Sequence, residues 1–455
     1  MAEGIVTKWT KLQKVKEKGG AKRIQVGIGL SKDKDGFTAA KTAAIEARNK
    51  LNGKTPTISF IYYVGEYDPT QINKGLLSVL KGTDFVGGST DRVLYNEEII
   101  DSGVLIVSLQ SDFLHVSIAS ADNVSKDPYG IAKKVVKEAV SKLTLDQYID
   151  PYLQVSRMKQ GKVEWLMKIP SFFVLAYTRG IKLPNMGEET KVINAIFDVL
   201  GPNVPIFGGS YGAPIEKLFG GKPYEIIIFH NGKILKDGTV IVINAGNILY
   251  GQALEHGAIR TNKIGSISKV SSGGYVVNEI SGMNIVDWYS KEVGLSREEF
   301  IKQSATITQR WPLGIPDGYG NFIIRGAGAY SKQNDIEGLG YVAPLIEGWP
   351  VYIMDASESN LMKASNIISN KIKEFTSEEK SPVIIFANLC ASRRAIFKEK
   401  LVEEQKKLRK EFGGAPLVGF SCYGEIGAAP GKPAGFQHMS ANIFVMYDKL
   451  LNEIK

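Results

Sequence analysis

One pattern constrains the fold of this chain more than any other. A strand, helix, strand, helix, strand order recurs three times, and each copy leads to a glycine-containing turn. The turns are Gly-Gly-Ser-Thr at 87–90, Gly-Gly-Ser-Tyr at 208–211 and Gly-Phe-Ser-Cys at 419–422. In the second and third copies, 36 residues separate the start of a strand, at Phe172 or Val383, from the glycine of the turn. Regular spacing of this kind indicates repeated structural units.

Hydrophobic periodicity assigns the elements of each unit. Alternating apolar residues at 23–29 and a continuous apolar run at 58–64 predict strands, and helical spacing at 38–52 predicts a helix that ends at Gly53. Further strands are predicted at 104–109, 115–119, 172–177, 225–229, 351–355, 383–387 and 441–447, and helices at 188–200, 358–375 and 393–412. The predicted fold class is α/β, with repeated β-α-β-α-β-β units forming layered sheets that are flanked by helices, in two domains.

The domain boundary is predicted near residue 250. A basic leader, 1–22, precedes a domain of two units at 23–250, and the third unit follows within 251–455. The stretch 251–349 does not fit the unit and is expected to be a strand-rich insertion. Within it, Gly294 is expected to end one helix, and Ser296 with Glu299 forms a capping box for the next.

Composition excludes several classes of function. A net charge of +9 spread over 455 residues is too dilute for a nucleic-acid-binding surface. Two cysteines and four histidines argue against a disulfide framework or a zinc cluster, and no apolar run approaches the roughly 18 residues of a membrane span. The sequence also lacks phosphate-loop, dinucleotide-binding, nucleophile-elbow and zinc-protease motifs. We expect a soluble, cytoplasmic protein without nucleic-acid partners or membrane insertion, and we favour a protein that is not an enzyme.

Several short segments resemble the FIST family, in which a FIST N-terminal and a FIST C-terminal domain occur in tandem. The N-terminal segments are 26–31 (Val-Gly-Ile-Gly-Leu-Ser), 87–89, 103–107 and 207–210. The C-terminal segments are 279–289, 312–315, 324–325, 390–393 (Cys-Ala-Ser-Arg) and 419–426 (Gly-Phe-Ser-Cys-Tyr-Gly-Glu-Ile). The resemblance implies an intracellular sensory or signal-transduction module that binds a small ligand such as an amino acid and often sits beside, or is fused to, an effector. This sequence departs from that pattern because it shows no effector segment, so we expect its output to come from a separate effector protein. Because one branch of the family is associated with haem, the resemblance also leaves open an axial role for His438 or His256.

The turns are the first candidate ligand-binding residues. Ligands of open α/β sheets bind beyond the strand ends, where glycine allows close approach and a hydroxyl can orient a carboxylate or an amide. The alternative is that glycine simply permits the turn and serine caps it. The candidates from these turns are Gly88, Ser89, Thr90, Gly209, Ser210, Tyr211, Ser421 and Cys422.

Four charged or thiol side chains complete the candidate site. Arg393, three residues after Cys390 at a helix start, could clamp an anion or favour a Cys390 thiolate, although both residues could instead be structural. Glu425 could bind a ligand amine, and Arg325 is a weaker candidate of the same kind. The leading hypothesis is a non-enzymatic sensor with a cleft lined by the Gly-Ser turns, Arg393 and Glu425. The alternatives are a thiol-dependent enzyme or redox sensor that uses Cys390, with Cys422 as its partner, and a protein-interaction scaffold. No cofactor is predicted, and a homodimer is expected only on general grounds.

Overall fold

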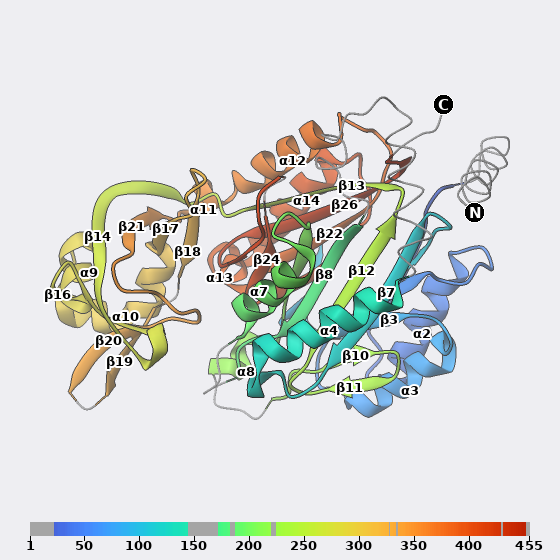
Figure 1. Cartoon of the computed structure of the whole chain (residues 1–455), viewed down its shortest axis with the longest axis horizontal. Helices are drawn as coiled ribbons and strands as arrows, with labels where there is room; N and C mark the ends of the chain where they lie inside the picture. Colours follow the sequence, from blue (N-terminus) through green and yellow to red (C-terminus); the bar gives the residue numbers. More distant parts are fainter. Residues whose placement is uncertain are drawn as a thin grey trace.

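The computed structural model describes residues 22–143, 172–182, 187–219, 224–326, 328–333, 335–428 and 431–451. The predicted leader, apart from Lys22, lies outside these residues. Three six-stranded sheets with their helices form the body of the molecule, and an eight-stranded sheet projects from one side of it (Figure 1). The predicted fold class, mixed α/β with sheets flanked by helices, is confirmed.

The three sheets of the body share one strand order. In each, the first strand of a unit is followed by its last, second and third strands, and then by a two-stranded hairpin. The first sheet runs β1 (Gln25–Ser31), β6 (Gly103–Gln110), β2 (Ile58–Val64), β3 (Phe85–Ser89), β10 (Ile228–His230), β11 (Lys233–Leu235). The second runs β7 (Leu114–Ala121), β12 (Thr239–Gly246), β8 (Phe172–Arg179), β9 (Ile206–Tyr211), β24 (Glu425–Gly427), β25 (Gly435–Gln437). The third runs β13 (Ile248–Glu255), β26 (Ala441–Leu450), β22 (Pro382–Cys390), β23 (Leu417–Cys422), β4 (Arg92–Tyr95), β5 (Glu98–Ile100).

The hairpin at the end of each sheet comes from a different unit. The first unit gives β4–β5 to the third sheet, where Val93 lies opposite Phe420. The second unit gives β10–β11 to the first sheet, and the third gives β24–β25 to the second. The exchange closes a ring, so no unit completes its own sheet.

Helices cover the outer faces of the three sheets, while the inner faces meet in one core (Figure 1). In that core, Phe420 stacks on Tyr62 and on Tyr211, with ring centroids 5.4 and 5.1 Å apart. Burial of large aromatic rings is a main source of stability. The covering helices are α2 (Gly36–Asn49) and α3 (Pro69–Leu80) on the first sheet, α4 (Pro128–Lys142) and α7 (Glu189–Leu200) on the second, and α12 (Ala364–Phe375), α13 (Ala391–Phe397) and α14 (Leu401–Glu411) on the third.

The projecting part is an insertion between β13 and the helices of the third unit, with a hydrophobic core of its own. Its helix α9 ends at Gly294, which has a left-handed φ of 75°, and Ser296 and Glu299 form both bonds of the predicted capping box. A short helix, α11 (Glu358–Leu361), leads back to the body. The elements of the insertion are β14 (Ile259–Ser271), β15 (Val276–Ile280), β16 (Met283–Asn284), α9 (Ile285–Val293), α10 (Arg297–Arg310), β17 (Leu313–Pro316), β18 (Phe322–Arg325), β19 (Ala329–Gln333), β20 (Ile336–Gly340) and β21 (Pro350–Asp355).

Two strand assignments made from the sequence are corrected. The strand at 351–355 is β21 of the insertion, because it pairs with β14 and β17, and the first strand of the third unit is β13. The boundary predicted near 250 therefore falls inside β13. The strand predicted at 225–229 corresponds to β10 of an exchanged hairpin, and the true counterpart of β6 in the second unit is β12. Hydrophobic periodicity shows that a strand exists but not which sheet it joins.

The first glycine of each turn is required by close packing of parallel strands. A Cβ atom at Gly87 would lie 2.0 Å from the carbonyl oxygen of Ile61. The equivalent distances are 1.8 Å for Gly208 and 2.0 Å for Gly419, in each case to a backbone oxygen of the neighbouring strand. At this position the recurring glycine is a folding requirement.

We therefore expect Gly87→Ala, and likewise Gly208→Ala, to lower the free energy of unfolding by roughly 1–3 kcal/mol or more, because the backbone oxygen cannot move away from the new Cβ without distorting the strand pairing. Gly435→Ala is the control, since the nearest atom would be 3.9 Å from its Cβ. Urea unfolding monitored by circular dichroism measures the difference. Equal midpoints for Gly87→Ala and Gly435→Ala would contradict this account of the turn.

Candidate functional site

The three turn serines occupy equivalent places at the end of the third strand of each unit. In the parallel pairs, Ser89 lies opposite Tyr63, Ser210 opposite Thr178 and Ser421 opposite Leu389. We call these places the first, second and third strand ends. They lie at the carboxyl edge of parallel strands, where α/β proteins bind their ligands.

The third strand end is occupied by a buried carboxylate from another unit. The Ser421 hydroxyl donates to Asp91 Oδ2 at 2.9 Å, and Asp91 is fully buried. Arg394 holds the same carboxylate with two bonds, of 2.9 and 3.1 Å, and the backbone N–H of Ile215 donates to it at 2.8 Å. Arg394 also bonds Glu216 of the short helix α8 (Ile215–Phe219) at 3.2 Å. This network ties the three units together.

The second strand end is also occupied by a carboxylate. The Ser210 hydroxyl donates to Oε1 of Glu189, the first residue of α7, and Glu189 is 1% exposed. Burial raises the pKa of Glu189 to about 7, against the opposing effects of the Ser210 bond and the Arg179 charge. Arg325, another predicted ligand-binding residue, is buried, and its guanidinium donates to the carbonyl oxygens of Ile324 and Phe436.

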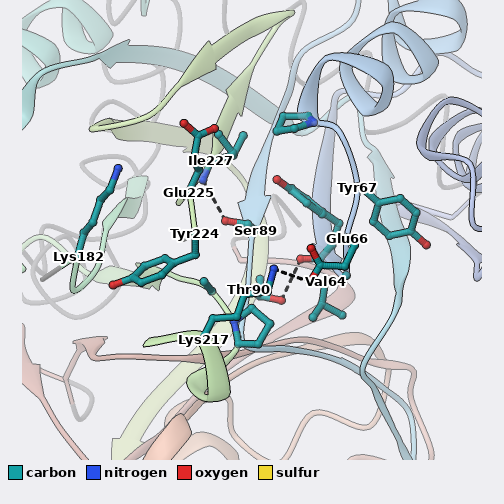
Figure 2. A pocket seen from close by; sticks show the side chains of 15 residues that line it. Val64, Glu66, Tyr67, Ser89, Thr90, Lys182, Lys217, Tyr224, Glu225 and Ile227 are labelled. Atoms are coloured by element: carbon teal, nitrogen blue, oxygen red, sulfur yellow. Dashed lines mark hydrogen bonds and ion pairs between the residues drawn. The ribbon is translucent and has the colours of Figure 1, made fainter. Parts of the chain in front are cut away.

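The first strand end opens into a cavity of about 460 Å³ (Figure 2). Ser89 and Thr90, two of the candidate ligand-binding residues, line it. The opposite wall comes from the second unit. Ala213, Pro214 and Lys217 form one part of it, and Tyr224, Glu225 and Ile227 form the other. The volume lies within the range of about 300–1,000 Å³ that is typical of small-molecule sites.

Charged groups of both signs surround this cavity. Lys217 Nζ pairs with Glu66 Oε1 at 2.5 Å across it, and Glu225 pairs with Lys236 at 2.8 Å. Lys182 lines the cavity and forms no ion pair within the part of the chain that the structure describes. The arrangement can bind a compact molecule that carries both a negative and a positive group.

Ser89 lines this cavity, and its hydroxyl oxygen already accepts one hydrogen bond from the protein. The backbone N–H of Ile227 donates to Ser89 Oγ at 3.0 Å, and Thr90 bonds the Tyr63 carbonyl oxygen (Figure 2). The hydrogen of the Ser89 hydroxyl is thus left for the Tyr63 phenol oxygen or for an acceptor in the cavity. Burial raises the pKa of Tyr63, which the Ser89 bond opposes, so that phenol stays protonated at neutral pH.

Glycine and aromatic residues next to the serines serve packing. A Cβ at Gly88 would meet the Ile227 carbonyl oxygen at 2.4 Å, and one at Gly209 would lie 3.2 Å from the Gly424 carbonyl oxygen. Tyr211 is fully buried and stacks on Tyr177 at 5.3 Å. These three predicted ligand-binding residues shape the strand ends, and they do not line the cavity at the first one.

The two cysteines and Glu425 form a separate buried cluster. Cys390 and Cys422 are register partners on β22 and β23, and both are free thiols. The Cys422 thiol donates to Glu425 Oε1 at 3.2 Å, and Ser440 donates through its N–H and its hydroxyl to Oε2 at 3.1 and 2.6 Å. Burial, and then the Glu425 charge, raises the pKa of both thiols. The two cysteines are neighbours, as the redox alternative requires. The raised pKa of both thiols nevertheless disfavours the thiolate that a reactive Cys390 would need.

Arg393 has a structural role in place of the predicted anion clamp. Its five N–H groups meet five protein acceptors, which leaves no donor for a ligand. Two are carboxylate oxygens of the fully buried Glu404, and three are carbonyl oxygens, those of His256, Met439 and Leu361 at 2.9–3.0 Å. Neither Arg393 nor Glu425 lines the cavity of Figure 2, so the predicted single cleft is corrected.

The two histidines considered as haem ligands lie in confined surroundings. His256 accepts from the Ala258 N–H at its Nδ1 and borders a cavity of about 190 Å³, below the usual range for a site of drug size. His438 packs edge-on against Phe436 at 4.8 Å, and burial lowers its pKa. Arg325 lies over the same Phe436 ring and bonds its carbonyl oxygen at 3.2 Å. Within the described residues, these surroundings do not fit a haem.

Sequence reasoning missed the charged residues that define the three strand ends. Asp91 directly follows the predicted Ser-Thr pair, and Glu189 begins a predicted helix, so both stood next to predicted features. Lys182, Lys217 and Glu66 lie in connections without periodicity, and only the exchange of segments between units brings them together.

Comparison with known families identifies the chain. A model of the FIST N domain matches residues 58–283, and a model of the FIST C domain matches residues 286–428. The chain belongs to the FIST family. FIST domains are generally sensory and signal-transduction modules. The border between the two family domains lies within the insertion, next to the start of α9.

Other comparisons give only remote likeness to this FIST protein. No curated protein matches the sequence. Among solved structures, cyanuric acid hydrolase from A. caulinodans is 10% identical with a TM-score of 0.26, over 49% of this chain and 71% of that one. PurL from T. maritima complexed with ADP is 10% identical with a TM-score of 0.21, over 93% and 72%. At such scores neither informs the fold or the function. None of the helices within the described residues is long and apolar enough to cross a membrane.

The buried carboxyl of Glu425 makes stability depend on pH. Burial raises its pKa from the ordinary 4.5 to about 7, so between these values the folded protein binds more protons than the unfolded chain. Stability should therefore fall as the pH rises from 4.5 to 7, with Glu189 acting in the same direction. We expect Glu425→Gln to reduce this slope by up to one proton, measured by urea unfolding from pH 4.5 to 8. The exposed Glu374→Gln is the control, and an unchanged slope in Glu425→Gln would contradict the assignment.

Proposed function

We propose that this FIST protein is a cytoplasmic, non-enzymatic sensor that binds a small polar metabolite, such as an amino acid, in the cavity of Figure 2. The observation that carries the proposal is the cavity of about 460 Å³ at the first strand end, with Ser89 and Thr90 in its wall. Its charged lining, with Lys182 and Lys217 on one hand and Glu66 and Glu225 on the other, is complementary to a zwitterion.

The position of the cavity between two units suits a sensor. Its wall includes Lys217 of α8, and the neighbouring Glu216 bonds Arg92 at 2.9 Å and Arg394 at 3.2 Å. A ligand that competes for Lys217 would thus act on a helix that also contacts the first and third units. Differential contacts of this kind are what a ligand needs in order to shift a conformational equilibrium. We propose that a separate effector protein reads this change.

A ligand screen by thermal shift tests the proposal. A ligand at about 100 times its dissociation constant should stabilise the protein by about 2.7 kcal/mol, and so raise its Tm. We expect at least one of the twenty amino acids to do so. In Lys182→Met the shift should be lost with little change in the unliganded Tm, because a single charge at the cavity is removed.

Lys137→Met is the matched control, since Lys137 is exposed on α4, away from the cavity. It should retain the full ligand shift. If no amino acid raises the Tm of the wild-type protein, or if Lys182→Met responds as the control does, the proposed function is wrong.

A further inference from the structure

The chain itself shows what its turn serines bind. At two of the three equivalent strand ends, the serine hydroxyl donates to a carboxylate: Ser210 to Glu189 and Ser421 to Asp91. Both carboxylates are buried, at 1% and 0% exposure. They come from different elements, one from a helix start in the same unit and one from the exchanged segment of another unit. The two strand ends therefore share the group that the serine binds, a carboxyl group, although different elements of the fold supply it.

A cation accompanies Asp91, which Arg394 binds with two hydrogen bonds. Glu189 has no such ion pair within the described residues, and burial raises its pKa. A buried carboxylate that stays charged needs a compensating cation, because removing its charge from water is costly. The first strand end provides a serine hydroxyl at Ser89 and cations at Lys182 and at Lys217, which also pairs with Glu66. Among the residues that the structure describes, no carboxylate bonds the Ser89 hydroxyl.

One residue explains why the first strand end is open. Helices α3 and α7 both have 12 residues, and four of the five buried positions of each correspond at a constant offset. In this correspondence Pro69 occupies the place of Glu189, each as the first residue of its helix. Pro69 lines the cavity and has no carboxylate to offer to Ser89. The matched buried pairs are Ile72 with Val192, Asn73 with Ile193, Gly75 with Ala195 and Leu76 with Ile196.

We propose that the ligand of the Figure 2 cavity is a small carboxylate, whose carboxylate group binds Ser89 in the place that Glu189 and Asp91 take at the other two strand ends. Lys182 and Lys217 supply the opposing charge. This inference rests on the proposed function and adds to it the chemical group that recognition requires. The amine of an amino acid is secondary, so a carboxylate without an amine binds, whereas an amine without a carboxylate does not.

The ligand part of the inference is tested with three related probes at equal ionic strength: alanine, propionate, which is alanine without the amine, and ethylamine, which is alanine without the carboxylate. We expect alanine and propionate to raise the Tm of the wild-type protein and ethylamine to leave it unchanged. Stabilisation by ethylamine with none by propionate would overturn the inference while leaving a ligand-binding cavity in place. Failure of the whole amino-acid screen would instead overturn the proposed function.

Pro69→Glu tests the structural part. It places a carboxylate where α7 carries Glu189, so we expect it to occupy Ser89 and to weaken propionate binding roughly 10- to 100-fold, the worth of one charged hydrogen bond. Pro69→Gln loses the same proline but carries no charge, and should bind within about threefold of the wild type. Calorimetric titration with propionate measures both, and the unliganded Tm reports folding. A Pro69→Glu protein that is folded and binds propionate as Pro69→Gln does would overturn the inference.

Discussion

Each sheet of the body is completed by a hairpin that belongs to another unit, and most other features of the structure depend on this exchange. A sheet edge without its hairpin would expose unpaired backbone groups. The three units must therefore fold against one another, and the aromatic residues of their inner faces then share a single core. The buried Asp91 network adds bonds between the same three units, at the end where the serines lie.

The exchange of hairpins brings together three units with chemically similar strand ends. Single residues then make these strand ends differ from one another. Glu189 fills the second strand end and Asp91 the third, whereas Pro69 leaves the first strand end open beside Lys182 and Lys217. Repetition is thus first a folding device, as the close contacts of Gly87, Gly208 and Gly419 show. The proposed ligand site lies where the repeat is broken.

The elements within one unit could be predicted from the sequence, because hydrophobic periodicity and capping residues are local. The strand at 58–64, the helix at 188–200 and the capping box at Ser296 are of this kind. Strand pairing is not local, which is why 351–355 was assigned to the wrong sheet. The same limit applies to the candidate site: the turn marks Ser89 and Thr90 as candidates, whereas Lys217 lies near them only through the exchange between units. Arg393 looked like an anion clamp because Glu404, its buried partner, carries no signal of that pairing in the sequence.

A crystal structure of the protein grown with propionate tests the central claim most directly. The account predicts electron density for a carboxylate in the cavity at the first strand end, with one oxygen accepting from Ser89 Oγ and with Lys182 or Lys217 opposite. The second and third strand ends should keep Glu189 and Asp91 on their serines. Density for propionate elsewhere, or with its methyl end against Ser89, would contradict the account.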